Sequence, residues 1–537
     1  MAIMAMDTKV NKLVVILSSC CLTFTSLAGD WQLKSSVNLD ETYSDNIELS
    51  QTDKTSGLVT QAGVSLGADY KAQNASLAFN STSTQAWYSH NHELDQAYNS
   101  INTNGRLLLW PNGLTLTGSA SLGNQARNSS QNALASIISA DLVQTERYQV
   151  GLEYNIDNSR YLLNSRANYQ MSESEDRLGE NKGSSFSFSS MNGSAAKNIF
   201  WEASGNYSER KNNNRDSNQY VAEIKVGLIT NYHFLPFIRY YDEDNAGKTN
   251  RRNNLETNSY GVGFRWQPIP RLLLDVSYNQ PIGTSVDTNN EEQKAYLDVE
   301  LNWQPTSRTH IQAGRSQRFY GDSYSFSLTH KNRRLSNSIN YQEQAQSFTR
   351  DNYVEVSSDF VCANADIFDN INNLDLSNCS LLTGDTFDPN EFSIITISGL
   401  ELVEDNDYWL NKTLGWSSVL TLPRTSFTLS LNHSDRENLN SGSSNTTKSA
   451  SLGANRKLSP SSTLGIQASY NERGYGQSAL NQNGQNDKYR RYGINFNKSL
   501  NQALNFTLDL DRIDRTSNQA RYNYSENRLS LRLSKDF

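Results

Sequence analysis

The chain has 537 residues, 36% of them hydrophobic, a formal net charge of -8 and a mean hydropathy of -0.66. The acidity argues against nucleic-acid binding, and no apolar run reaches the roughly 18 residues that a membrane-spanning helix needs. Length alone predicts about three domains, but hairpin patterns repeat without a linker or a shift in composition, which favours one continuous domain.

The first predicted element is an export signal at residues 1–28. An apolar run from Leu13 to Ala28 follows two lysines and ends in small residues, which is typical of a signal peptide cleaved after Ala28. An alternative interpretation is a lipoprotein signal in which Cys20 carries the lipid. Export without a spanning helix leaves the periplasm, the outer membrane or the medium, and indicates a bacterium with two membranes.

Apolar and polar residues then alternate along residues 29–537. In the clearest stretch, Leu297, Val299 and Leu301 share one face of an extended segment, and Asp298 and Glu300 share the other. Each such run covers about ten or more residues, as a tilted membrane strand requires, whereas strands of soluble sheets typically have about five or six. We therefore expect one face of each strand to meet lipid and the other to line a lumen. The predicted lumen face carries charges of both signs: Arg265, Asp275, Asp298, Glu300, Asp509, Arg528 and Arg532.

The connections between these strands alternate in length. Tight reversals occur near residues 71–74, 111–113, 157–159, 195–198, 231–233, 267–270, 304–307, 331–334, 423–425, 459–462 and 498–502. Most opposite connections are longer and polar, at 124–144, 210–218, 244–256, 281–293, 347–407, 436–447 and 474–487. This predicts an all-β transmembrane antiparallel up-and-down β-barrel of about 24 strands (roughly 22 to 26), with short periplasmic turns and long extracellular loops.

Aromatic residues recur at the strand ends beside the tight turns. Trp110, Trp266 and Trp303 all occupy this position, and Tyr70 occupies the equivalent place in an early hairpin. Aromatic residues also have a high intrinsic preference for strands, which is the simpler explanation. Their shared position favours an aromatic girdle at the inner membrane interface.

The longest connection, at about 347–407, is an acidic insert. Residues 351–407 contain 13 carboxylates and no Lys or Arg. Cys362 and Cys379 also lie there, and in an oxidising compartment they favour a structural disulfide over a metal or redox pair, because a CxxC spacing is absent. One hypothesis is a solvated surface loop, and the other is a gate that folds over or into the barrel, held by divalent cations.

The final predicted strand covers Arg528–Phe537. Leu529, Leu531, Leu533 and the terminal Phe537 share one face. This pattern resembles the C-terminal signal that the barrel assembly machinery recognises in outer-membrane proteins. Lys535 departs from it, because that position usually carries an apolar or aromatic residue.

Several blocks resemble a known family of outer-membrane proteins. They are WQPIPR at 266–271, WQPTSR at 303–308, RFYGDSYSFSLTHKNRRLSNSINYQE at 318–343, DETYSDNIEL at 40–49 and LPRTSFTLSLNHSDRE at 422–437. In these blocks the chain resembles the outer-membrane proteins associated with the PEP-CTERM and exosortase system. The resemblance implies a barrel that works beside exopolysaccharide and surface-protein sorting machinery, and it supplies no site residues.

No residue pattern supports an enzyme. Asp298 with Glu300, and Asp509 with Asp511, are paired carboxylates in form, but residues two apart on a wet strand face are more often lumen charges, which Arg528 and Arg532 would balance for the second pair. His90 and His92 have spacing for a shared metal without a clear third ligand. No GxSxG elbow is present. We therefore expect no catalytic site, cofactor or metal.

Three functions remain open at this point. The first is a channel or accessory barrel for the export of surface polymer or protein, with polysaccharide export components as partners. The second is a structural or adhesive barrel without transport, and the third is a nutrient-uptake porin. A TonB-dependent receptor is disfavoured because hairpins start almost at the predicted cleavage site, which leaves no room for a plug domain. The partners expected in every case are outer-membrane lipid, lipopolysaccharide and the barrel assembly machinery.

Overall fold

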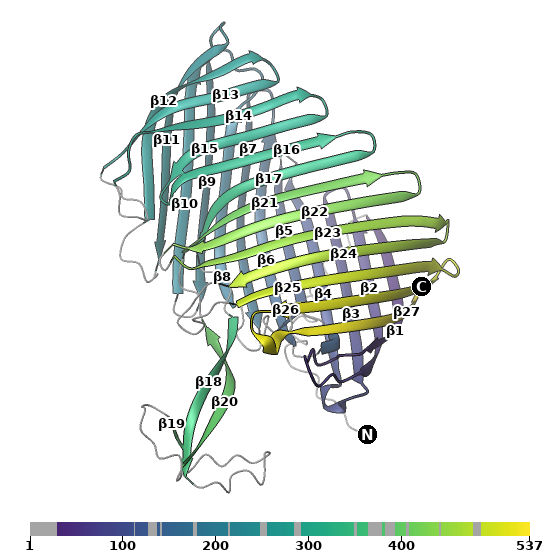
Figure 1. Ribbon diagram of the computed structural model, residues 1–537. Helices are drawn as coiled ribbons and strands as arrows, with labels where there is room; N and C mark the ends of the chain where they lie inside the picture. Colours follow the sequence, from purple (N-terminus) through teal and green to yellow (C-terminus); the bar gives the residue numbers. More distant parts are fainter. Residues whose placement is uncertain are drawn as a thin grey trace.

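The alternating segments form strands that join edge to edge in a computed structural model of the protein (Figure 1). Twenty-four strands make one antiparallel sheet, in which most strands pair with the strands before and after them in sequence. The exceptions are β17 (Leu335–Ser347), which pairs with β21 (Tyr408–Thr421), and β27 (Tyr524–Asp536), which pairs with β1 (Asp30–Ser44) and closes the sheet. The predicted up-and-down barrel and its strand number are confirmed.

The structure describes residues 29–537 apart from 112, 127–136, 140–141, 175–179, 213–214, 248–254, 284–291, 348–351, 364–378, 382–391, 404–407, 440–441 and 476–484. The predicted signal peptide at 1–28 lies outside the described residues. The first half of the barrel continues with β2 (Gly57–Lys71), β3 (Ala75–Tyr88), β4 (Gln96–Trp110), β5 (Leu114–Ala126), β6 (Leu142–Asp157), β7 (Tyr161–Ser174), β8 (Asn181–Asn192), β9 (Ile199–Asn212), β10 (Arg215–Leu228), β11 (Phe234–Gly247) and β12 (Leu255–Ile269). The second half has β13 (Leu272–Pro281), β14 (Tyr296–Thr306), β15 (Thr309–Arg318), β16 (Gly321–Lys331), β22 (Thr425–Asn438), β23 (Ser444–Ser459), β24 (Ser462–Tyr475), β25 (Gln485–Ser499) and β26 (Leu504–Ser517).

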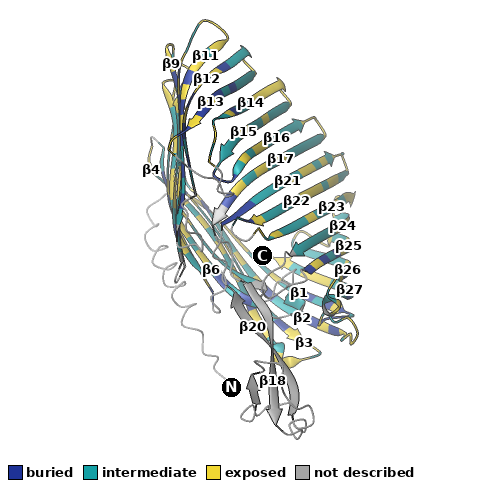
Figure 2. Ribbon diagram, turned by 60° about the vertical axis from the view of Figure 1, so that its left-hand side comes forward, coloured by how far each residue is buried: buried dark blue, intermediate teal, exposed yellow. Residues whose placement is uncertain are grey.

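The two faces of the barrel wall differ in chemistry. Exposed and buried residues alternate along many strands (Figure 2), and the exposed positions include large apolar side chains such as Val262, Ile238 and Leu452. Many of their neighbours in sequence point inward and are polar, such as Arg239 beside Ile238 and Arg265 beside Phe264. A closed sheet with an apolar exterior and a polar interior is a membrane-spanning β-barrel, because every backbone polar group inside the bilayer is paired within the wall.

The tight turns predicted from the sequence all join neighbouring strands. Two of them follow a Trp-Gln-Pro segment, and in both the ladder loses its register, between Trp266 and Ile269 and between Trp303 and Thr306. Proline has no N–H to donate, so the ladder cannot continue regularly through it. At a third turn Gly113 has φ +106°, and a Cβ there would lie 1.9 Å from the carbonyl oxygen of Asn155, so only glycine fits.

On the opposite rim the strands extend further than the sequence predicts. The connection expected at 210–218 is largely strand, because β9 ends at Asn212 and β10 begins at Arg215. The connection expected at 436–447 likewise shortens to the segment between Asn438 and Ser444. Beyond the membrane both faces of a strand meet water, so the alternation that reveals a strand in the sequence disappears there.

The predicted insert is not a plain loop. Register between β17 and β21 runs up to the pair Ser347 and Tyr408, and the intervening chain forms β18 (Asn352–Ala363), β19 (Cys379–Leu381) and β20 (Phe392–Val403) in a separate three-stranded sheet. Cys362 lies opposite Cys379 in the register of β18 and β19. Cα atoms of opposed residues are about 4.5 to 5.5 Å apart in such a pair, which suits a disulfide. The disulfide and the gate remain predictions.

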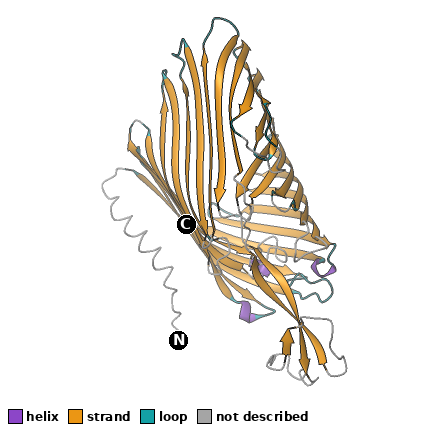
Figure 3. Cartoon of the chain, turned by 90° about the vertical axis from the view of Figure 1, so that its left-hand side faces the viewer, coloured by secondary structure: helices purple, strands orange, loops and turns teal. Residues whose placement is uncertain are grey.

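Helical structure is minor in the described part of the chain. The short 3₁₀ turns η1 (His92–Leu94), η2 (Ile137–Ser139) and η5 (Ala520–Tyr522) lie at the same end of the barrel, beside the longer loops (Figure 3). Within the described residues, no helix has the length and apolar character needed to cross a membrane.

Candidate functional site in the barrel lumen

Charged side chains from seven consecutive strands meet on the inner side of one part of the barrel wall, which we call the lumen corner. They come from β9 to β15 and comprise Glu202, Glu223, Lys225, Arg239, Glu243, Arg265, Asp275, Asp298, Glu300 and Arg318. Many of these side chains are buried, although each belongs to the wet face of its strand.

Lys225 joins strands that are not neighbours. Its Nζ lies 2.5 Å from Glu300 Oε2 on β14 and 3.6 Å from Asp275 Oδ2 on β13. Neighbouring strands are about 4.8 Å apart, so β10 and β14 are separated by roughly 19 Å along the wall. A 2.5 Å contact across that separation requires the wall to bend sharply between β10 and β14. This bend narrows the lumen between these strands.

Glycines on the inner face of β12 make this curvature possible. A Cβ at Gly261 would lie 2.1 Å from Asn279 Oδ1, and one at Gly263 would lie 2.4 Å from the carbonyl oxygen of Val276. Side chains crowd together on the concave face of a bent sheet, and residues without a side chain relieve that crowding. The shape of the corner therefore depends on glycine at positions 261 and 263 as well as on the ion pairs.

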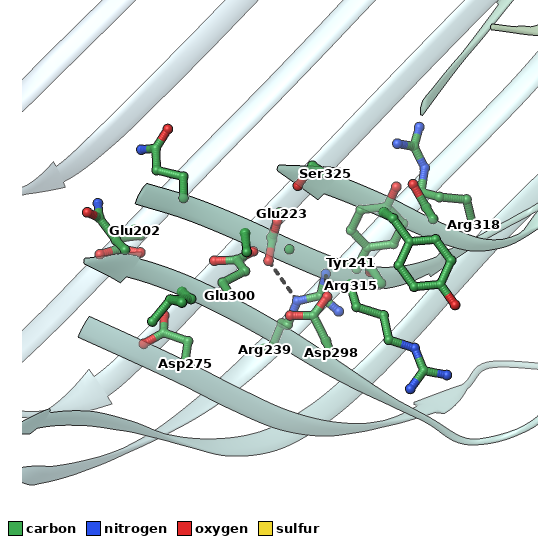
Figure 4. A pocket seen from close by; sticks show the side chains of 18 of the residues that line it. Glu202, Glu223, Arg239, Tyr241, Asp275, Asp298, Glu300, Arg315, Arg318 and Ser325 are labelled. Atoms are coloured by element: carbon green, nitrogen blue, oxygen red, sulfur yellow. Dashed lines mark hydrogen bonds and ion pairs between the residues drawn. The ribbon is translucent and has the colours of Figure 1, made fainter. Parts of the chain in front are cut away.

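Arg239 lies at the centre of the corner (Figure 4). Its Nε donates to Glu223 Oε1 at 2.6 Å, and its Nη2 lies 3.3 Å from Asp298 Oδ2. Its Nη1 donates to Asn279 Oδ1 and to the Tyr296 hydroxyl, both at 3.3 Å. The Arg239 side chain is 2% exposed, so a guanidinium fully withdrawn from solvent connects β10, β13 and β14 to β11.

Arg265 forms a second bridge on the side of the turns. Nε and Nη2 donate to the two oxygens of Asp275, each at 2.7 Å, in the bidentate geometry that a planar guanidinium favours. Its Nη1 also lies 2.8 Å from Glu202 on β9, three strands away, and its guanidinium lies over the ring of Phe200 at 4.5 Å. One side chain therefore ties β9, β12 and β13 together.

The corner is also closed at the loop-side rim. Arg318 Nε on β15 lies 2.5 Å from Glu243 Oε2 on β11, four strands away. Nearby, the Tyr408 hydroxyl of β21 donates to the carbonyl oxygen of Ala246 at 3.3 Å. Tyr408 packs in a buried apolar cluster with Phe319, Tyr320, Ala345 and Leu410. This cluster covers the corner where the connection between β15 and β16 is short.

A cavity of about 580 Å³ lies within the corner. The side chains that face it include the carboxylates of Glu202, Glu223, Asp275, Asp298 and Glu300, the guanidiniums of Arg239, Arg265 and Arg318, and the Ser325 hydroxyl (Figure 4). The Lys225 ammonium contacts two of these carboxylates, Glu300 and Asp275, so the lining is close to charge balance. The corner charges are paired with one another, so they brace the wall and give the cavity a polar lining.

A second cluster closes part of the rim on the other side of the barrel. Val59, Ala86, Tyr88 and Tyr98 are buried on the inner face of β2 to β4 together with Ile47. The Tyr88 hydroxyl lies 3.0 Å from that of Tyr98 and donates to the carbonyl oxygen of Ile137 at 2.5 Å. The η2 turn is thereby held against the inner wall.

The sequence identified only part of the lumen corner. It placed Arg265, Asp275, Asp298 and Glu300 on inward faces, and the structure brings them together. It missed Lys225, Arg239, Glu243, Arg318 and Glu202, although the alternation along β10 and β11 already put Lys225 and Arg239 on the inner face. The expected pairing of Arg532 with the Asp509 and Asp511 strand is wrong, because Arg532 pairs with Asp40 across the closure and Asp511 with Arg491.

The other predicted residues lie on the outer surface or near the rims. Trp110 and Trp303 are exposed beside their turns, Trp266 is half-buried, and Tyr70 is covered by Trp31, whose ring lies 4.8 Å away. The C-terminal residues Leu529, Leu531, Leu533 and Phe537 share the exposed outer face. The girdle and the assembly signal remain predictions.

The expected absence of a histidine metal site stays a prediction. His92 Nδ1 lies 3.2 Å from Asp95 Oδ2, which gives it a local partner beside η1. Within the described residues, no group of three or more His, Cys, Asp or Glu side chains is placed to hold a metal ion.

Comparison with known proteins finds distant likeness in structure alone. No family model matches the chain, and no curated protein matches it. Among solved structures, the FrpB iron transporter from Neisseria meningitidis has a TM-score of 0.46 and 10% identity over 94% of this chain and 81% of its own. The siderophore receptor PirA from Acinetobacter baumannii has a TM-score of 0.43 and 10% identity over 94% and 80%.

A third solved structure is a loop-deletion mutant of OmpT, an outer membrane protein of Vibrio cholerae. Its TM-score is 0.31 with 8% identity, over 95% of this chain and 100% of its own. These likenesses are too distant to indicate what the chain binds or transports.

Proposed function

We propose that this chain is an outer-membrane channel, or an accessory component of one, in the export of exopolysaccharide or surface proteins by a PEP-CTERM/exosortase system. The observation that carries the proposal is a closed wall of 24 strands with an apolar exterior and polar inner side chains. A wall of this size encloses a lumen wide enough for a polymer or an inserted segment. The sequence resemblance supports the export system as the setting.

The lumen corner bears on the kind of cargo. The corner cavity is lined by paired charges together with the polar side chains of Asn302, Gln312 and Ser325. Amide, hydroxyl and carboxylate groups suit hydrogen bonding to the hydroxyl groups of a sugar chain. The ion pairs across the corner confine passage to the remainder of the lumen.

Single-channel recording in planar bilayers tests the proposal. The purified, folded barrel is expected to conduct, and the double variant Lys225→Met/Glu300→Gln is expected to conduct more, because it removes the bridge between β10 and β14 without changing the net charge. The control Arg491→Met/Asp511→Asn removes a pair between neighbouring strands, with the same charge balance, and is expected to conduct like the original protein.

Deletion of the gene tests the biological setting. Cells without it are expected to carry less exopolysaccharide or sorted protein on their surface, and the unmodified gene is expected to restore both. Surfaces of normal composition after deletion would contradict the export proposal.

A structural barrel without transport is the second candidate, and the bridges favour it. Arg239, Arg265 and Arg318 each connect strands two to four positions apart, which stiffens the wall and narrows the lumen. A folded barrel that never conducts, with or without the bridge between β10 and β14, would establish this candidate in place of the channel.

A further inference from the structure

Basic residues are concentrated at the tight turns along one part of the turn-side rim. Six turns connect β12 to β13, β14 to β15, β16 to β17, β21 to β22, β23 to β24 and β25 to β26. Six nine-residue segments at these turns contain nine Arg and Lys residues in total and no Asp or Glu: 266–274, 303–311, 329–337, 419–427, 455–463 and 497–505. We call this stretch of rim the basic arc.

The charges of the basic arc are exposed. Each turn or its strand ends contribute at least one exposed cation: Arg271, Arg308, Arg334, Arg424, Arg456 and Lys498. Among the described residues, these six side chains make no ion pair with a carboxylate, and Arg308 contacts only the amide oxygen of Asn332 at 3.4 Å. Six exposed cations on one rim repel one another unless an anionic partner neutralises them.

The remaining arc of the same rim is nearly neutral. Its five tight turns lie between β2 and β3, β4 and β5, β6 and β7, β8 and β9, and β10 and β11. These turns and the adjoining strand ends carry three basic residues, Lys71, Arg160 and Lys197, and two acidic residues, Asp69 and Asp157. Asp69 also pairs with Lys34 at 2.9 Å. The positive charge is therefore a property of one arc and not of tight turns in general.

Several basic residues lie on the lipid-facing side of the wall, near the tight turns. Residues an even number of positions apart share one face of a strand. Arg456 therefore lies on the same outer face of β23 as Leu452, and Lys498 on the same outer face of β25 as Ile494. Lys535 likewise follows Leu533 on β27, and its Nζ lies 4.7 Å from the centre of the Phe537 ring. Long basic side chains at this position extend along apolar surface and place their charges at the membrane interface.

We propose that the basic arc binds the phosphate groups of anionic phospholipids in the membrane leaflet that the tight turns face. Successive turns are two strands, or about 10 Å, apart, so the cations follow the outer circumference of the barrel. A soluble polyanion that enters the lumen would instead meet cations on the inner face. The arc selects lipids by charge. On β27, Lys535 would add a further phosphate contact at the position where the C-terminal signal usually has an apolar residue.

Lipid association with the whole barrel tests the proposal. The purified protein is reconstituted in phosphatidylcholine, and spin-labelled phosphatidylglycerol and phosphatidylcholine are compared for the fraction immobilised at its surface. Phosphatidylglycerol is expected to associate more strongly, by up to roughly fivefold for each cation that lies near a phosphate, and the preference is expected to fall as ionic strength rises.

Matched variants locate the binding. Arg308→Gln/Arg424→Gln/Lys498→Gln removes three charges from the basic arc and is expected to abolish most of the preference. Lys71→Gln/Arg160→Gln/Lys197→Gln removes three charges from the other arc of the same rim and is expected to retain it. Heat-modifiable migration on gels identifies folded protein for both variants.

Three outcomes would overturn the proposal. The first is equal immobilisation of the two lipids by the unmodified protein, a measurement that needs no variant. The second is an equal loss of preference in both triple variants. The third is displacement of phosphatidylglycerol by soluble polyglutamate or an acidic polysaccharide at similar charge concentration, which would identify a soluble polyanion as the partner. None of these measurements depends on whether the lumen conducts.

Discussion

The lumen corner and the closure between β27 and β1 both place buried carboxylates in polar contacts, but these contacts join different kinds of strand pair. At the corner, Lys225 and Arg318 each reach a carboxylate four strands away. At the closure, Arg532 pairs with Asp40 and the Ser44 hydroxyl donates to Glu526 at 2.6 Å, between strands that already share a ladder. The corner contacts therefore determine the shape of the lumen, whereas those of the closure reinforce an existing edge.

The energetic consequences should differ in the same direction. A backbone ladder keeps neighbouring strands together when one side-chain pair is lost, and an exposed pair contributes only about 0 to 1 kcal/mol. No ladder joins β10 to β14 or β11 to β15, so the removal of a corner cation leaves buried carboxylates unpaired and also releases the curvature. Each of the following variants tests this difference.

Arg239→Met should have the largest effect. It leaves Glu223 and Asp298 without their shared guanidinium, and the loss of one partner from a buried ion pair costs about 3 to 5 kcal/mol. Denaturant unfolding of the folded barrel in lipid, followed by heat-modifiable gel migration, measures the change in free energy of unfolding. A loss below about 1 kcal/mol would show that the corner is no more demanding than an exposed pair.

Gly261→Val should cause the second-largest loss in the free energy of unfolding. It opposes the bend of β12 and leaves the charges of the corner unchanged. The added side chain would start 2.1 Å from Asn279 Oδ1, and overpacking of this kind typically costs about 1 to 3 kcal/mol. Gly123→Val on β5 is the matched control, because a Cβ there meets nothing within 4 Å. Equal stability of the two variants, measured by the same unfolding assay, would contradict the role of β12 in the bend.

Arg239 and Gly261 also show which features of the corner the sequence predicts and which it does not. Alternation is a local pattern, so it reveals the strands, the tight turns and the inward position of Arg265 and Asp298. The contact between Lys225 and Glu300 joins residues 75 positions apart in sequence and depends on how sharply the closed wall bends. Only the inward glycines of β12 hint at that bend in the sequence, and their effect depends on the residues opposite them.

Arg532→Met should have a small effect at the closure. The Arg532 side chain is 58% exposed, and Asp40 keeps a second donor in the Asn38 amide at 2.6 Å. We expect a loss of about 0 to 1 kcal/mol in the unfolding assay, well below that of Arg239→Met. A loss as large as that of the corner variant would mean that the ladder between β27 and β1 depends on this pair, and the contrast between the two regions would disappear.

Asp45, in the connection between β1 and β2, gives the smallest and most specific test of the closure. Partial burial acts to raise the pKa of Asp45, but hydrogen bonds from the Asn527 backbone and side chain, at 2.7 and 2.6 Å, with nearby cations, hold it below its ordinary 3.8. A carboxylate with a lowered pKa stabilises the fold above its unfolded pKa, and this contribution is lost as the pH falls through the folded pKa. The stability difference between the original protein and Asp45→Asn should therefore be constant near neutral pH and shrink below about pH 4. A difference that stays constant in acid would assign the effect to the shape of the turn rather than to the charge at the closure.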